Sequence, residues 1–142
     1  MAPGPRQPTP ATAGYSGTPL PAKLGVKEGS IVALIDAPAG FESLLEPLPA
    51  GARARRSGRG ASEVMVVFVR TFDQLASAVA RFTPRTDIHY LWLAWPKKTS
   101  RLAGPLGEND LRDAGLAAGW VDTKVCAIDA DWSGLRFTRR KS

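Results

Sequence analysis

Short, nearly continuous apolar runs alternate along the chain with segments of helical spacing. The runs at Ile31–Ile35, 63–69 and 88–95 are each bounded by Gly, Pro or charged residues. Runs that are apolar throughout, without alternation, predict strands covered on both faces of a sheet. The segment "ARARR", 52–56, alternates small and charged residues, which predicts a strand at or near the sheet edge.

Helical segments separate these strands. In "TFDQLASAVARF", 71–82, apolar residues recur at helical intervals, and Thr71 and Gln74 have capping-box spacing. Shorter helices are predicted for "GFESLLEPLP" and for "ENDLRDAGLAAG", the latter with Asn109 or Asp110 as its N-cap and Gly119 as its stop. One helical turn is predicted at Leu20–Leu24.

The last two strands, 121–128 and 134–140, flank the turn-like "DADWSG" and predict an antiparallel hairpin. Alternating strands and helices predict a single-domain α/β fold with a mostly parallel, Rossmann-like sheet. With the C-terminal hairpin, this fold resembles a reduced methyltransferase. A similarity of fold carries no chemistry by itself.

Length and composition support one soluble domain. The chain has 142 residues, 44% of them hydrophobic, with one cysteine and one histidine. We expect a disordered Pro-rich segment at 1–12, a domain at 13–142 and a basic tail at 138–142. Because no signal-peptide pattern or long apolar run is present, the prediction is a cytoplasmic protein without membrane association, and no metal-ligand spacing occurs.

Unusual loops follow the predicted parallel strands. In an open α/β sheet, ligands bind outside the carboxyl ends of the strands. We call this predicted edge the rim and define it by 36–41, Arg70, 95–98 and 129–134. The candidate ligand-binding residues there are Asp36, Arg70, Trp95, Lys97, Lys98, Trp132 and Ser133.

Two interpretations of the rim stay open. The tryptophans either stack on a planar ligand or belong to the core at the sheet margin. Lys97 and Lys98 either face a cleft or only keep the strand end soluble after Pro96 terminates it.

Most catalytic and cofactor chemistry finds no support in the sequence. A nucleotide or S-adenosylmethionine site needs glycines after the first strand, where "DAPAGF" offers only Gly40, and an acid after the second, where "RRSGRG" stands. His89 falls in a predicted strand, and Cys126 is better explained as a buried strand residue than as a nucleophile activated by Lys124. No cofactor and no catalytic residue are predicted.

The net charge of +6 comes from local basic clusters at 53–59, 97–101 and 136–141. Such clusters attract phosphate-bearing partners or are simply a solvated surface. A nucleic-acid partner is the weaker alternative, because no helix-turn-helix, RNA-recognition signature or aromatic–basic interleaving is present.

Several motifs, in order, resemble one family. "GYSGTPL", "VALIDAPAGFESLLEPLP", "LWLAWPKK", "GLAAGWVDTKVCAID" and "WSGLRF" are similar to a family of small bacterial proteins, common in actinobacteria, whose domain has no assigned function. The resemblance covers nearly all of residues 14–138. It implies no activity, cofactor or catalytic residue.

The sequence therefore predicts a non-catalytic binding or regulatory module. Its expected partner is an anionic small molecule or an acidic protein segment at the rim. The alternatives are a degenerate methyltransferase-like enzyme and a nucleic-acid-binding protein.

Overall fold

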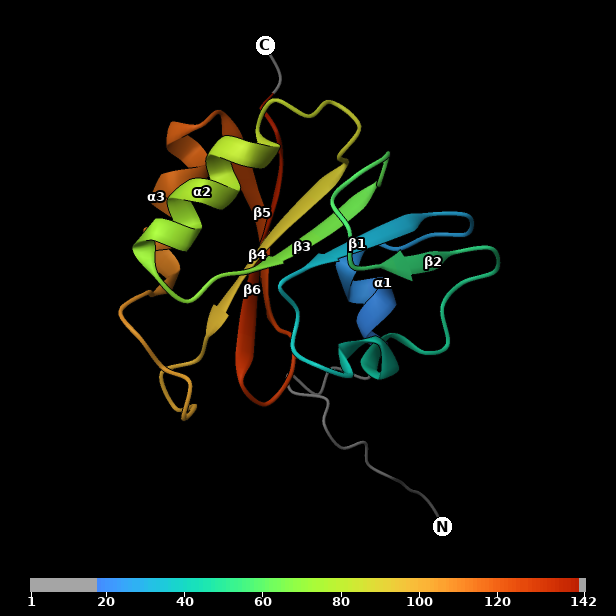
Figure 1. Cartoon of the computed structure of the whole chain (residues 1–142), viewed down its shortest axis with the longest axis horizontal. Coiled ribbons are helices and arrows are strands. Elements are labelled where there is room, and N and C mark those ends of the chain that lie inside the picture. The colour runs from blue at the N-terminus through green and yellow to red at the C-terminus, as the bar shows by residue number, and fades with distance from the viewer. Residues whose placement is uncertain (1–17, 141–142) are drawn as a thin grey trace.

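The computed structural model describes residues 18–140 and contains a six-stranded sheet in the order β2-β1-β3-β4-β6-β5 (Figure 1). The strands are β1 (Ile31–Ile35), β2 (Arg53–Arg55), β3 (Val64–Phe68), β4 (Tyr90–Pro96), β5 (Trp120–Ala127) and β6 (Trp132–Arg139). The helices are α1 (Leu20–Leu24), the 3₁₀ helix η1 (Phe41–Leu45), α2 (Phe72–Phe82) and α3 (Glu108–Ala117). The predicted disordered segment 1–12 lies outside the described residues, and β6 extends into the predicted basic tail.

Strand directions confirm the predicted fold class. β2, β1, β3 and β4 are mutually parallel neighbours, whereas β6 pairs antiparallel with both β4 and β5. The C-terminal hairpin is therefore present, and its second strand lies between β4 and β5. Because β5 runs in the same direction as β4, the hairpin turn lies at the carboxyl end of the parallel strands.

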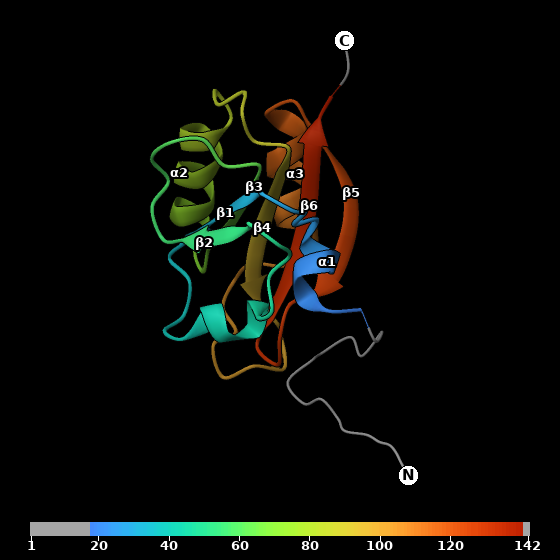
Figure 2. The same cartoon turned by 90° about the vertical axis from the view of Figure 1, so that its right-hand side faces the viewer.

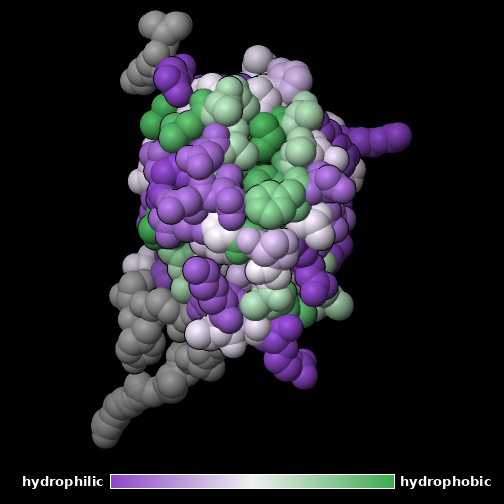
Figure 3. All heavy atoms as spheres, turned by 90° about the vertical axis from the view of Figure 1, so that its left-hand side faces the viewer, coloured by the Kyte–Doolittle hydropathy of each residue, from purple (hydrophilic) through white to green (hydrophobic). Residues whose placement is uncertain are grey.

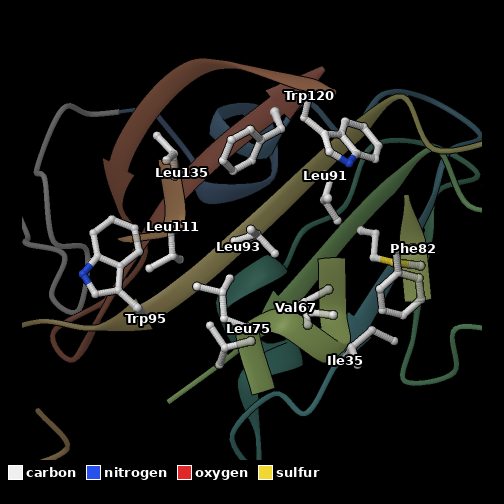
Figure 4. Close-up of a cluster of buried hydrophobic side chains, with 14 of the residues drawn as sticks. Ile35, Val67, Leu75, Phe82, Leu91, Leu93, Trp95, Leu111, Trp120 and Leu135 are labelled. Atoms are coloured by element: carbon white, nitrogen blue, oxygen red, sulfur yellow. The ribbon is translucent and has the colours of Figure 1, made fainter. Parts of the chain in front are cut away.

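Both faces of the sheet are covered, as the continuous apolar runs predict. α2 and α3 pack on one face, and α1 and η1 on the other (Figure 2). In β1, Ala33 and Ile35 face α2, while Val32 and Leu34 face the α1 and η1 side. Figure 4 shows the cluster beneath α2 and α3, in which Trp95 of β4 lies beside Leu111 of α3.

Helix starts differ in detail from the predictions. Thr71 Oγ1 accepts from the Gln74 amide at 3.1 Å, but Gln74 Oε1 accepts from the Arg70 amide at 2.6 Å, one residue before the N-cap. α3 begins at Glu108 with Gly107 as its N-cap, so the prediction of Asn109 or Asp110 was wrong. Asp110 lies in the first turn, where its carboxylate accepts from the Gly107 amide at 2.9 Å.

His89 is not inside a strand, because β4 begins at Tyr90 and the His89 side chain is exposed. Within residues 18–140, every helix falls short of the length and apolarity that a bilayer crossing requires.

Candidate functional site

The end of β4 and the β5–β6 turn meet at the rim, toward the lower side of both cartoon views (Figures 1 and 2). Pro96 pairs with Trp132, and the Lys97 amide donates to the Asp131 carbonyl at 2.8 Å. The Ser100 hydroxyl donates to Asp131 Oδ1 at 2.8 Å. The predicted proximity of the "WPKK" segment and the hairpin turn is therefore confirmed.

The hairpin turn is held by its own aspartates. Asp129 Oδ1 accepts from the amides of Asp131 and Trp132, each at 2.8 Å. An aspartate that bonds to the backbone two residues on is a common turn element. Asp129 and Asp131 thus fix the position of the turn against the lysine segment.

The two tryptophans of the rim are core residues. Trp95 is 6% exposed and Trp132 is 5% exposed. Trp95 lies in the cluster under α2 and α3, whereas Trp132 lies in the opposite cluster, edge-to-face with Phe68 at 5.0 Å. They lie on opposite faces of the sheet and so form no common stacking surface.

A cavity of about 730 Å³, called here the rim cavity, opens beside the lysines. Its walls come from the end of β4, the loop 97–107, the first turn of α3 and Ser133 of β6. Four predicted site residues contribute to its lining: Trp95, Lys97, Lys98 and Ser133. The volume falls within the range of roughly 300–1,000 Å³ typical of small-molecule sites.

In the described part of the chain, the acidic side chains around this cavity have hydrogen-bond or ion-pair partners, whereas the two lysines do not. Glu108 is paired with Arg112, and Asp110 accepts from the Gly107 amide. Within residues 18–140, the ammonium groups of Lys97 and Lys98 have neither a hydrogen-bond nor an ion-pair partner. The first turn of α3 adds the backbone N–H groups of Glu108 and Asn109, which have no intrahelical acceptor, whereas the Asp110 amide donates to the Gly107 carbonyl. The cavity therefore offers hydrogen-bond donors and the two ammonium groups, beside the carboxylates of Glu108 and Asp110.

The remaining predicted residues lie apart from this cavity or at its margin. Arg70 is exposed, and its carbonyl lies 3.3 Å from the position of a Cβ on Gly104, a cavity residue. Trp132 is in the core. Asp36, with a φ of 59°, lines a second, smaller pocket between β1, β3 and α2.

Sequence reasoning missed a clamp on the loop after β1. The Arg56 guanidinium donates to the carbonyls of Ala37 and Pro38, both at 2.8 Å, and to both carboxylate oxygens of Glu42. These hydrogen bonds lower the pKa of Glu42 to about 2. Arg56 follows β2, so an arginine and its acid occupy the space between the ends of β1 and β2.

Arg55 of the 53–59 cluster and Arg85, which follows α2, also hold the backbone. Arg55 donates to the carbonyls of Ser57 and Ala61. Arg85 donates to the carbonyls of Gly58 and Gly60, at 2.7 and 2.8 Å, and to Asp87. Much of the local positive charge is therefore engaged in fixing the loop 56–61.

The Arg85–Asp87 pair predicts a pH dependence. Hydrogen bonds from Arg85 hold the pKa of Asp87 well below its usual range. A lowered pKa in the folded state stabilises the fold above the unfolded-state pKa, about 3.9, and this contribution disappears as the pH falls further. We expect Asp87→Asn to cost about 1–3 kcal/mol at pH 7, a difference that shrinks below about pH 4. Urea unfolding at pH 7, 4 and 3 measures it.

The control for this pH series is Asp113→Asn, at an exposed position of α3. It should change the free energy of unfolding by less than about 0.5 kcal/mol at every pH. An Asp87→Asn loss that stays constant down to pH 3 would show that carboxylate charge is not responsible.

The cysteine and metal predictions concern groups away from the rim cavity. Cys126 is half-buried, and burial raises the pKa of its thiol, although Lys23, Lys124 and Arg136 act in the opposite direction. A raised thiol pKa disfavours the thiolate and with it nucleophilic chemistry. Within residues 18–140, no group of three or more His, Cys, Asp or Glu side chains is placed to hold a metal ion.

Comparisons with known proteins give structural similarity only. No family model matches the sequence, and no curated protein matches it. A SAM-dependent methyltransferase from Aquifex aeolicus is similar in structure, with a TM-score of 0.53, 17% identity, and coverage of 83% of this chain and 86% of that chain. Magnesium protoporphyrin IX methyltransferase from Synechocystis PCC 6803, solved with bound SAH, has a TM-score of 0.51 at 11% identity, over 84% of this chain and 78% of that one.

At these identities the similarity establishes the fold and leaves the activity undetermined. The chain therefore has a methyltransferase-like α/β fold with a C-terminal antiparallel hairpin.

Proposed function

We propose that this methyltransferase-like domain is a non-catalytic module that binds an anionic small molecule in the rim cavity. The observation that carries the proposal is a pair of lysines, Lys97 and Lys98, that line a cavity of about 730 Å³ without an acidic partner in the described residues. The hydroxyl of Ser133 and the first turn of α3 supply further donors. Buried Trp95 and Leu106 supply an apolar wall.

The expected strength of binding follows from these groups. A hydrogen bond to a charged group contributes about 1.5–3 kcal/mol, and a helix N-terminus favours an anion by about 0.3–1 kcal/mol. Two lysines and a helix start together contribute about 3–7 kcal/mol before the cost of association is subtracted, so we expect binding no tighter than about millimolar. Binding should weaken as salt concentration rises, because the lysines are only partly shielded from solvent.

We expect Lys97→Gln/Lys98→Gln to reduce the affinity for citrate and for inorganic phosphate at least tenfold. Both probes are titrated at low salt and followed by amide chemical shifts of residues 97–110. The fold should be little affected, because exposed charges contribute under about 1 kcal/mol. An unfolded double variant would show that the lysines are structural and would contradict the proposal.

The matched control is Lys27→Gln/Lys124→Gln, which removes the same charge from two exposed positions away from the rim. It should change the affinity by less than about twofold. If the affinity fell equally in both double variants, the cause would be the net charge of +6 and not the cavity. If an acidic peptide bound to the protein and neither phosphate nor citrate did, the partner would be a protein segment.

A methyltransferase-like enzyme is the second candidate, favoured by the fold similarity to SAM-dependent methyltransferases. The residues after β1 do not fit S-adenosylmethionine well. Only Gly40 would let the backbone approach the ligand closely. After β2, where an acid would bind the ribose hydroxyls, the chain has Arg56, which is paired with Glu42. Thermal shift with S-adenosylmethionine and S-adenosylhomocysteine distinguishes the candidates, since a ligand at 100 times its Kd stabilises by about 2.7 kcal/mol.

A further inference from the structure

A second pocket lies between α2 and the carboxyl ends of β1 and β3. Its volume is about 220 Å³, and none of its lining residues is shared with the rim cavity. Buried apolar side chains form its floor: Ile35, Val67, Val69, Ala78 and Phe82. Exposed polar side chains form its margin: Asp36, Asp73, Gln74, Ser77 and Arg81.

The position of this pocket is that of a ligand site in open α/β sheets. β1 and β3 are adjacent and parallel, but the chain leaves β1 toward β2 on one side and β3 toward β4 on the other. Such a reversal of strand order leaves a crevice at the carboxyl ends of the two strands, where ligands bind.

The margin of the pocket carries two acids and one base, Asp36, Asp73 and Arg81. Asp36 follows β1 and Asp73 lies in the first turn of α2. Within the described residues, neither carboxylate has a hydrogen-bond or ion-pair partner. Arg81, the basic residue of the margin, lies eight residues after Asp73 along α2, about 12 Å at 1.5 Å per residue, with its guanidinium 4.7 Å from the centre of the Phe82 ring.

The apolar floor and the two carboxylates without a partner in the described residues suggest a ligand class. We propose that this pocket, called here the α2–β1 pocket, binds a small amine with an apolar body. The ammonium group lies between Asp36 and Asp73, and the apolar part covers Val69, Ala78 and Phe82. The volume limits the ligand to something smaller than a nucleoside cofactor, because drug-sized sites begin near 300 Å³.

The surface around α2 is mixed in polarity. Figure 3 views the side of the molecule that carries α2 and α3, where hydrophobic residues are interspersed with hydrophilic ones. The charge preference is opposite to that of the rim cavity, so one domain offers a basic site and an acidic site on the same sheet edge.

The test uses phenethylamine and its neutral isostere 2-phenylethanol, titrated at low salt and followed by amide chemical shifts. Phenethylamine should give saturable shifts at residues 36, 73–78 and 82, and the alcohol should bind at least tenfold more weakly. Asp36→Asn/Asp73→Asn should weaken the amine at least tenfold. Asparagine tolerates the positive φ of 59° at position 36, so the backbone is preserved.

Three control variants distinguish binding of the amine in the pocket from its general attraction to acidic side chains. Asp113→Asn should leave the affinity unchanged. Ser77→Trp should block the pocket, whereas Ala76→Trp, at an exposed neighbouring position that does not line it, should not. Equal binding of amine and alcohol, shifts spread over unrelated acidic residues, or full binding by Ser77→Trp would each overturn the proposal.

Discussion

Replacing Gly115 by alanine should destabilise the domain by about 1–3 kcal/mol, the usual cost of overpacking a core. Gly115 is buried in α3, and a Cβ there would lie 2.2 Å from Cε1 and 2.5 Å from Cζ of Phe137. Phe137 is fully buried in β6. Helix propensity alone predicts the opposite sign, a gain of about 1 kcal/mol from alanine, so urea unfolding gives a clear decision.

Two further variants isolate the cause. Ala117→Gly, at an exposed position of the same helix, should cost about 1 kcal/mol through propensity alone. Phe137→Leu should reduce the penalty of Gly115→Ala in the double variant, because the smaller side chain makes room for the methyl group. A Gly115→Ala protein that is more stable than the wild type would contradict the close packing of α3 on β6.

This packing also bears on the proposed function. The first turn of α3 lines the rim cavity, and the helix is fixed at its C-terminal half by the contact of Gly115 with Phe137. A displacement of α3 would therefore move Glu108 and Asp110 relative to Lys97. Gly115→Ala should weaken the binding of citrate even though it lies outside the cavity.

The local patterns were sufficient to predict the sheet and the meeting of the "WPKK" segment with the hairpin turn, but not the separate position of Asp36. Runs such as Ile31–Ile35 are apolar on both sides because α2 covers one face and η1 the other. The adjacency of Lys97 and Asp131 follows from strand direction, since β5 runs parallel to β4 and brings the hairpin turn to the same edge.

The sequence did not show on which face of the sheet each rim tryptophan lies. Trp95 and Trp132 are on opposite faces because Pro96, not Trp95, pairs with Trp132. A register shift of one residue reverses the face, and no motif in the sequence fixes the β4–β6 register. The Arg56–Glu42 clamp was missed for a similar reason: its partners are 14 residues apart and meet through the path of η1 and β2.

Replacing Trp92 by alanine should cost about 3–5 kcal/mol, as for other large aromatic residues in cores. Trp92 is fully buried between α1 and the sheet, and its indole Nε1 donates to the Leu24 carbonyl at 3.0 Å. The variant loses both the packing and this hydrogen bond, leaving the carbonyl of the α1 terminus without its donor. Urea unfolding followed by circular dichroism measures the loss.

Trp92→Phe should recover most of the packing but not the hydrogen bond, so its cost should lie near 1–2 kcal/mol. The control is Phe72→Ala, which removes an aromatic ring that is 52% exposed and should cost less than about 0.5 kcal/mol. With a total stability of about 5–15 kcal/mol for such a domain, Trp92→Ala should approach the limit of folding. A loss below about 1 kcal/mol would mean that α1 does not depend on Trp92 for its position on the sheet.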